Sequence, residues 1–335
     1  MSKKKISYLL NKDLPIIKGN YGGNLLINGH FVNEFPREDR HEYSNINTLK
    51  WLFIKNPQKR EKKADTFMVN TIRNVEIFDS KKDMIVWLGH ATFLIRIAGI
   101  TILTDPSIRI PGFKTYTKSP YTIRDLRNID YLLISHNHFD HMYPRAIQSI
   151  KSSNLSALVP LGVSKQIKRI RRELTIQEAG WYQQYALNRD DLKIYFLPSY
   201  HWSMGGITGL DRNKTLWGSF IIQSDKRTIY FAGDTAYSRH FKEIGALFPK
   251  IDFCIMPIGT YSPKYLFMLF HMPPQDAVTG FNDLKGKVFI PMHYGTFDQS
   301  EEPPGEPIRL LKRLENSNAI NGDLKTPGMG EILEI

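Results

Sequence analysis

Cysteine is nearly absent from this chain of 335 residues, which contains a single one, Cys254. One thiol excludes both a disulfide framework and a metal site built on cysteine. Cys254 lies within the apolar run DFCIMPIG, where we expect it to act as a small buried hydrophobe.

Long apolar runs are missing too. No segment approaches the roughly 18 unbroken apolar residues that a transmembrane helix requires. The amino terminus begins MSKKK and then offers only ISYLL before Asn11, which is too short for the apolar core of a signal peptide. We therefore expect a cytoplasmic protein, with peripheral contact to a membrane left open.

Acidic residues are outnumbered, 33 against 45 basic ones, and the formal net charge is +12. Residues 1–63 carry 13 lysines and arginines against 6 acidic residues, and KQIKRIRR at 165–172 is typical of the outer face of a helix. This excess favours an anionic partner, such as a phospholipid surface or a phosphate-bearing substrate. A basic, well-solvated surface is the alternative. No nucleic-acid module is recognisable, so we expect no specific nucleic acid.

Residues 1–83 have the texture of an irregular extension that packs on the rest of the chain. They are rich in asparagine, glycine and lysine and contain one apolar patch, LKWLFIK at 49–55. Because lysines follow it, this patch is a candidate for contact with anionic lipid. It is equally typical of an extension that folds back on its own domain.

From Met84 onward, short apolar runs rich in β-branched and aromatic residues alternate with turns, which indicates strands. We expect helices near 144–151, 162–172, 238–246, 273–284 and 305–315. So many strands with so few helices favour an α/β (α+β) architecture in which two packed mixed sheets are flanked by helices. We assign residues 84–335 to one domain.

The string HNHFDH at 136–141 carries the strongest chemical signal in the sequence. His136 and His138 alternate along an extended turn after the strand YLLIS, so both imidazoles can face the same way. Asp140 and His141 then turn toward a second point. Since one metal ion takes about four nitrogen or oxygen ligands, further ligands are expected from elsewhere. A solvated polar loop is the competing interpretation.

Three residues later in the chain are candidates for these further ligands. His201, Asp234 and His293 each follow a buried apolar run, namely IYFLPSY, IYFAG and VFIPM. If those strands are neighbours, their ends converge on one edge of the sheets. Seven ligands are too many for one ion and suit two, with Asp234 bridging them. The seven are His136, His138, Asp140, His141, His201, Asp234 and His293.

With these residues the sequence resembles the metallo-β-lactamase fold, whose hallmark is His-x-His-x-Asp-His. Within that fold it resembles the N-acyl-phosphatidylethanolamine-hydrolysing phospholipases D. The resemblance extends from about residue 84 to 300. It is carried by WLGHATFLI (87–95), TDP (104–106), SPYTIRDL (119–126), IDYLLISHNHFDHM (129–142), VPLG (159–162), PSYHW (198–202), LWGS (216–219), FAGDT (231–235), PIGTY (257–261) and MHYGTF (292–297).

The resemblance implies an αββα sandwich that holds two zinc ions. Imidazole and carboxylate ligands without thiolate fit zinc, and manganese or iron is left open. One ion would be held by His136, His138 and His201, the other by Asp140, His141 and His293, with Asp234 between them. A water that bridges two such ions loses a proton near neutral pH. The hydroxide would attack phosphorus, and Asp140 is expected to orient it.

His271, in LFHMPPQDA, is placed by the resemblance facing the substrate, as a phosphate contact or as the acid that protonates the leaving alkoxide. A capping or packing histidine is the alternative. Phe270 stands where relatives carry glutamine, which leaves head-group selectivity open. The segment YSPKYLFMLF, which begins with Tyr261, either lines an acyl-chain groove with Tyr261 in contact with substrate or packs as an ordinary apolar helix. His90 is expected to hydrogen-bond behind the ligands.

Three functions remain compatible with the sequence. The first is a di-zinc phosphodiesterase of phospholipase D type that acts on N-acyl-phosphatidylethanolamine-like glycerophospholipids. The second is a lactonase or another phosphodiester or ester hydrolase with a soluble substrate. The third is a membrane- or nucleic-acid-binding protein with structural metals, which a shared carboxylate disfavours because structural zinc sites are closed and usually mononuclear. A homodimer is left open.

Overall fold

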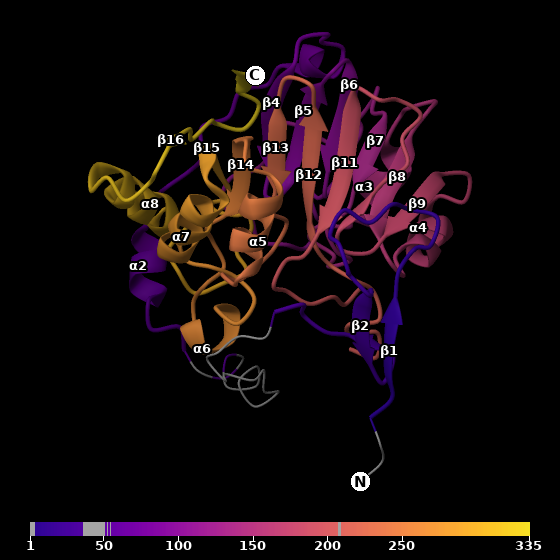
Figure 1. Ribbon diagram of the computed structural model, residues 1–335. Coiled ribbons are helices and arrows are strands. Elements are labelled where there is room, and N and C mark those ends of the chain that lie inside the picture. The colour runs from indigo at the N-terminus through magenta and orange to yellow at the C-terminus, as the bar shows by residue number, and fades with distance from the viewer. Residues whose placement is uncertain (1–3, 36–50, 52, 54, 207–208) are drawn as a thin grey trace.

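Two seven-stranded sheets pack face to face in the computed structural model, with helices on their outer sides (Figure 1). The structure describes residues 4–35, 51, 53, 55–206 and 209–335. The antiparallel strands β1 (Ile6–Leu9) and β2 (Asn24–Ile27) and the helix α6 (Lys264–Phe267) lie at one end of the sandwich, and the carboxyl terminus lies at the other (Figure 1).

The first sheet is mixed, with β17, β4, β5 and β6 antiparallel and β6 to β9 parallel. Its central strands are buried on both faces, which explains why they consist of continuous apolar runs rather than alternating patterns. In spatial order the strands are β17 (Ile332–Glu334), β4 (Met84–Gly89), β5 (Thr92–Ile97), β6 (Ile100–Thr104), β7 (Tyr131–Leu133), β8 (Ser156–Pro160) and β9 (Thr175–Ala179).

The second sheet is also mixed: β10 to β13 are antiparallel, and β13 to β16 are parallel. Its strands in order are β10 (Gln183–Gln184), β11 (Leu192–Leu197), β12 (Ser219–Ser224), β13 (Thr228–Phe231), β14 (Ile251–Pro257), β15 (Gly286–Met292) and β16 (Asp323–Leu324). The two mixed sheets expected from the sequence are therefore confirmed.

All five helices expected from the sequence are present, within two residues at each end. They are α3 (Pro144–Ser149), α4 (Ser164–Ile170), α5 (His240–Leu247), α7 (Pro274–Leu284) and α8 (Glu306–Asn316). The short helix α2 (Lys59–Ala64) was not expected, whereas α6 (Lys264–Phe267) lies in YSPKYLFMLF, for which an apolar helix was one of the two alternatives. No helix in the described part of the chain has the length and hydrophobicity needed to cross a bilayer.

Two apolar cores result from strands that are buried on both faces. Ile85 and Trp87 of β4 point into the core between the sheets, whereas Val86 and Leu88 point outward into a second core. The second core lies under α3 and α4, which contribute Ile147 among others. Because alternate residues of β4 face the two cores, the strand packs against the second sheet on one side and against helices on the other. This packing gives the four-layer αββα arrangement.

The description of residues 1–83 as irregular is wrong where the structure describes them. A small sheet forms from β1 (Ile6–Leu9), β2 (Asn24–Ile27) and β3 (His30–Phe31), and α2 and a 3₁₀ turn (Val75–Phe78) follow. Phe31 is buried in the core between the sheets. Of the patch LKWLFIK, residues 49, 50, 52 and 54 lie outside the described residues. The division at residue 83 stays a prediction.

Replacing Phe31 with alanine tests whether the amino-terminal segment belongs to the cooperative fold. Phe31 is 2% exposed, so Phe31→Ala leaves a cavity and should lower the free energy of unfolding by about 3 kcal/mol. Urea denaturation measures this change. Ile6→Ala, at a position that is 60% exposed, is the control and should change little. Equal stabilities of the two variants would show that the segment is detachable.

Candidate metal centre

The site lies at the edge of the sandwich where several parallel strands end. Strands β13, β14 and β15 are parallel, and β11 runs the same way because β12 is antiparallel to both β11 and β13. The residues that follow these strands therefore emerge at one edge. Strand β7 of the other sheet ends there too, since His136 Nε2 lies 4.0 Å from Asp234 Oδ2.

His136, His138 and His201 form a first group of ligand atoms. His138 Nδ1 lies 2.8 Å from His136 Nε2 and 3.3 Å from His201 Nε2. The remaining nitrogens of two rings are already engaged: His136 Nδ1 lies 2.9 Å from Ser135 Oγ, and His201 Nδ1 lies 2.9 Å from the carbonyl oxygen of Phe270. Donation from these Nδ1 atoms leaves the Nε2 lone pairs free to converge with His138 Nδ1.

Asp140, His141 and His293 form the second group, which His90 joins from one side. Asp140 Oδ2 lies 3.8 Å from His141 Nε2 and 4.0 Å from His293 Nε2. The side chains of His141 and His293 are buried. These are the residues that the resemblance assigned to a second ion.

Asp234 lies between the two groups. Its Oδ2 atom is 3.1 Å from His141 Nε2, 3.8 Å from His201 Nε2 and 4.0 Å from His136 Nε2. Its Oδ1 atom is 3.3 Å from His293 Nε2. One carboxylate thus faces imidazoles of both groups, and the structure brings together all seven residues singled out from the sequence.

The converging atoms suit a cation. Within the described residues, His293 Nε2 and Asp234 Oδ1 are buried without a hydrogen-bond partner. Buried polar atoms are seldom left in this state unless they bind a ligand or an ion. Imidazole and carboxylate donors without a thiolate form a ligand set for zinc or a similar divalent metal.

The protonation states of His138 and His201 agree with this interpretation. Burial lowers the pKa of His138 to about 4 and that of His201 to about 3, so both rings are neutral near pH 7, the form that binds a metal. His141 is different: burial would lower its pKa, but Asp234 and Asp140 raise it well above the ordinary range, so this ring must release a proton to bind a metal. Burial would raise the pKa of Asp140 and Asp234, but the charge of His141 outweighs it and holds both pKa values well below the ordinary range. Both carboxylates are therefore ionised.

A hydrogen-bond network centred on Asp105 orients the ligands, and sequence analysis missed it. The fully buried Asp105 accepts hydrogen bonds at Oδ2 from His141 Nδ1 (2.7 Å) and from Ser135 Oγ (2.6 Å). Ser135 Oγ in turn contacts His136 Nδ1. One carboxylate thus fixes a ring in each ligand group. In the sequence, Asp105 stood out only as part of TDP (104–106). That motif contributes to the resemblance, but no role was assigned to Asp105 there.

Asp140 is held from behind by two further side chains. His90 Nε2 lies 3.1 Å from Asp140 Oδ2, in agreement with the expected hydrogen bond behind the ligands. Gln299 Nε2 donates to the same oxygen at 2.7 Å. Gln299 lies in a loop after β15 and has no motif around it, so the sequence offered no reason to select it.

Two glycines permit the close approach of the loops. A Cβ at Gly233 would lie 2.6 Å from the Cβ of Ser135, and Gly233 has a φ of +58°. A Cβ at Gly259 would collide with the carbonyl oxygen of His293. The sequences FAGDT and PIGTY therefore need glycine so that Asp234 and His293 can reach the HNHFDH loop.

A cavity of about 460 Å³ opens onto the ligand cluster. His271 lines it, and His271 Nδ1 lies 3.8 Å from Asp234 Oδ2. Tyr261 does not line it: its side chain is buried and its hydroxyl donates to Glu306 Oε1 at 2.7 Å. The structure thus brings His271 to the site but not Tyr261. The polar part of the lining also includes His138, Asp140, Asp234, Thr260, His293 and Gln299, and the apolar part is Trp51, Trp202, Met204, Leu266, Phe267 and Phe270.

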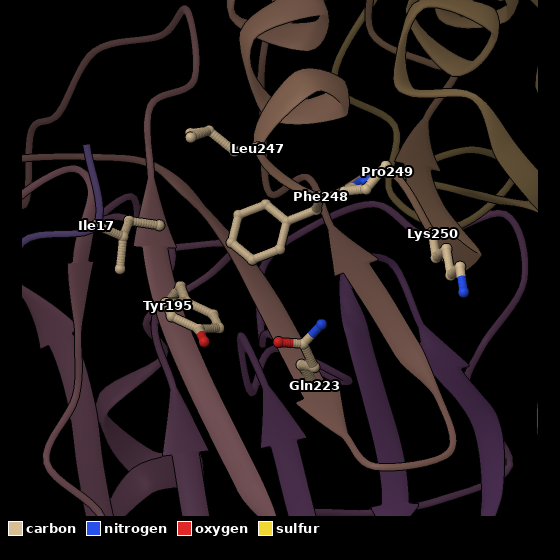
Figure 2. Close-up of a pocket in the computed structure, with 7 residues that line it drawn as sticks. All are labelled: Ile17, Tyr195, Gln223, Leu247, Phe248, Pro249 and Lys250. Atoms are coloured by element: carbon tan, nitrogen blue, oxygen red, sulfur yellow. The ribbon is translucent and has the colours of Figure 1, made fainter. Parts of the chain in front are cut away.

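A second cavity, of about 360 Å³, lies elsewhere, between β11, β12 and the segment that joins α5 to β14 (Figure 2). Tyr195 and Phe248 face each other in it, and Lys250 lies at its side (Figure 2). It contains no histidine or acidic residue, so it lacks the groups for metal chemistry.

The remaining histidines lie away from the ligand cluster or outside the structure's described part. His41 lies outside the described residues. His30 and His240 hydrogen-bond to Arg212 O and Thr235 Oγ1 respectively.

Comparison with known proteins gives the family. The family model described as "Beta-lactamase superfamily domain" matches residues 101–294. The chain belongs to the β-lactamase superfamily. It is similar to the Caenorhabditis elegans N-acyl-phosphatidylethanolamine-hydrolyzing phospholipase D 1, with 29% identity over 297 residues and 83% of each chain covered.

One further relative supports the family, and one solved structure supports the fold. A metal-dependent hydrolase from Caldivirga maquilingensis is 30% identical over 231 residues, which cover 68% of this chain and 89% of the relative. Igni18, a metallo hydrolase from Ignicoccus hospitalis, has the same fold, with a TM-score of 0.59, 21% identity, and coverage of 75% of this chain and 97% of Igni18. The protein is a metal-dependent hydrolase of the metallo-β-lactamase superfamily.

Replacing Asp105 tests the orienting network. Asp105→Asn removes the charge that holds His141 and, through Ser135, His136, and should weaken metal binding about 10- to 100-fold. Competition with a chromophoric chelator measures the affinity. Asp125→Asn is the control, because Asp125 pairs with Arg73 and has no contact with the cluster. An unchanged affinity in Asp105→Asn would show that the ligands orient themselves.

Proposed function

We propose that the protein is a di-zinc phosphodiesterase of phospholipase D type that acts on N-acyl-phosphatidylethanolamine-like glycerophospholipids. The observation that carries the proposal is the composition of the 460 Å³ cavity, in which an imidazole and carboxylate floor adjoins an apolar wall. A phosphodiester with long acyl chains needs both surfaces at once. The resemblance to the C. elegans phospholipase D supports this substrate class.

The ligand atoms divide between two ions as follows. His136, His138 and His201 would hold one, Asp140, His141 and His293 the other, and Asp234 would contact both. When bound, the two cations would supply Lewis acidity that acidifies water and neutralises the charge developing on the phosphate oxygens. Asp140 keeps a fixed orientation because His90 and Gln299 hold its Oδ2 atom, which suits it to accept a hydrogen bond from the attacking water.

His271 would act on the substrate, either by contacting the phosphate or by protonating the leaving alkoxide. Its ring lines the cavity, and its Nδ1 atom is buried without a hydrogen-bond partner in the described structure. Burial lowers the pKa of His271 to about 3, so the ring is neutral near pH 7. Its nitrogen is free to bond a phosphate oxygen, and it would protonate the leaving alkoxide once the negative charge of the bound phosphate has raised that pKa. The peptide oxygen of the preceding residue, Phe270, holds His201, so His271 and a metal ligand are positioned by the same turn.

The apolar wall would accommodate the acyl chains and exclude water. Trp51 packs edge-on against Phe267 with ring centroids 5.4 Å apart, and Trp202 lies 5.8 Å from Phe270. Phe53, two residues beyond Trp51, is 83% exposed and precedes the lysine-rich α2. An exposed aromatic ring beside lysines suits the surface of an anionic membrane. We propose that lipid enters from that surface.

A substrate panel tests the proposal. The holoenzyme should hydrolyse N-acyl-phosphatidylethanolamine in mixed micelles at least about 100-fold more efficiently than bis-p-nitrophenyl phosphate, since remote binding of the acyl chains supports turnover. A panel of lactones should not react. Mass spectrometry should identify phosphatidic acid and the N-acylethanolamine as products.

Chelation provides the control for the panel. Removal of metal should abolish hydrolysis, and two equivalents of zinc per chain should restore it. Hydrolysis of lactones alone would establish a lactonase and refute the phospholipase proposal. Restoration by manganese or iron but not by zinc would refute the assignment of the metal.

Replacing His271 tests its role separately from metal binding. His271→Gln should lower kcat for the lipid about 100-fold, the scale of a lost general acid, while the metal content stays unchanged. The loss should be smaller with bis-p-nitrophenyl phosphate, because p-nitrophenolate leaves without a proton. His30→Gln, outside the cavity, is the control. A wild-type kcat on both substrates would remove His271 from the reaction.

A further inference from the structure

A third cavity, of about 380 Å³, lies on the outer side of the HNHFDH loop. It is formed by the long segment after β6 and by the start of α3, and none of its lining residues lines the catalytic cavity. Neither the metal centre nor the proposed reaction uses it. Its lining nevertheless combines charge and apolar surface in a way that indicates a ligand.

Three cations line this cavity: Arg109, Lys118 and Arg145. No acidic residue is part of the lining. Among the residues that the structure describes, none of the three makes an ion pair or a side-chain hydrogen bond, whereas the neighbouring Lys114 pairs with Asp298 at 2.6 Å. Three unpaired positive charges around one concave surface produce a positive potential that attracts an anion.

The rest of the lining is largely apolar, and it is anchored on the core. Ile110 and Tyr143 are buried, and Phe113 and Ile123 complete the wall. The ring of Phe113 lies 6.3 Å from that of Phe139, and the ring of Tyr143 lies 5.3 Å from it. Phe139 stands between His138 and Asp140, so the cavity and the metal centre lie on opposite sides of one loop.

We propose that this cavity binds a phosphate monoester that carries an apolar chain. A phosphate monoester has a charge between about −1.5 and −2 at pH 7, which suits three cations better than the single charge of a carboxylate. The two guanidinium groups supply the planar pairs of N–H donors that phosphate oxygens accept. The apolar wall contacts the chain. The site is additional to the proposed catalytic function and does not depend on it.

Methyl NMR on the holoenzyme distinguishes this cavity from the catalytic one. The δ1 methyl groups of Ile110 and Ile123 report on the new site, and the ε methyl group of Met204 reports on the catalytic cavity. Titration with dihexanoylphosphatidic acid should shift both isoleucine methyls. Inorganic phosphate should shift the same signals with at least about tenfold weaker affinity, since it lacks the chain. Dihexanoylphosphatidylcholine should not shift them.

Charge removal provides the second arm. The triple variant Arg109→Ala, Lys118→Ala, Arg145→Ala should weaken the binding seen at Ile110 and Ile123 at least about tenfold and leave thermal stability unchanged, because the three side chains are exposed. The matched control removes three exposed cations from the α4 region, as Lys165→Ala, Arg169→Ala, Arg172→Ala, and should bind as the wild type does.

Three results would overturn the proposal. The first is the absence of any shift at Ile110 and Ile123 when Met204 shifts. The second is equal affinity of the triple variant and the wild type. The third is equal affinity for inorganic phosphate and for the lipid, which would assign the cavity to the free anion and refute the role of the chain.

Discussion

A buried carboxylate surrounded by imidazoles is the interaction on which the rest of this structure depends. Asp234 is 2% exposed and lies within 4.0 Å of ring nitrogens from His136, His141, His201 and His293. Burying an ionised group is costly unless opposite charge and hydrogen-bond donors compensate for it. The compensating groups come from loops of both sheets, so the charge balance of one aspartate links the two halves of the sandwich.

That balance requires each imidazole to present a particular nitrogen, and the structure achieves this through hydrogen bonds behind the rings. Asp105 fixes His141 directly and His136 through Ser135, while the Phe270 carbonyl oxygen fixes His201. These partners are as much a part of the site as the ligands, because a rotated ring presents a donor where a lone pair is needed. The TDP segment at the end of β6 therefore positions the candidate ligands, although Asp105 does not line the cavity.

The fold separates reaction chemistry from recognition. Strand ends supply the histidines and aspartates, and their positions are rigid because the strands are buried on both faces. Longer segments line the cavities on either side of the HNHFDH loop: α6 and the segment around Trp202 line one, and the basic segment after β6 lines the other. Loops can change without disturbing the metal centre, which explains how one superfamily fold serves different substrates.

Much of the fold could be predicted from the sequence, and so could the residues that the structure brings together in the candidate metal centre. Continuous apolar runs specified the strands, and the five expected helices are present within two residues at each end. The seven proposed ligands were accessible because each is a metal-capable side chain directly after such a run, a purely local pattern. The amino-terminal strands were missed because β1 is exposed at all four positions and shows no periodic burial.

Other features were decided only by the tertiary structure. Asp105, Gln299 and the cation-lined cavity are defined by contacts between segments distant in sequence; for example, Gln299 and Asp140 are 159 residues apart. Tyr261 was expected near substrate but turns to Glu306. A sequence specifies which side chains follow a strand, because that depends on neighbours along the chain. Which groups stand behind them depends on how distant loops pack, and no local pattern records that packing.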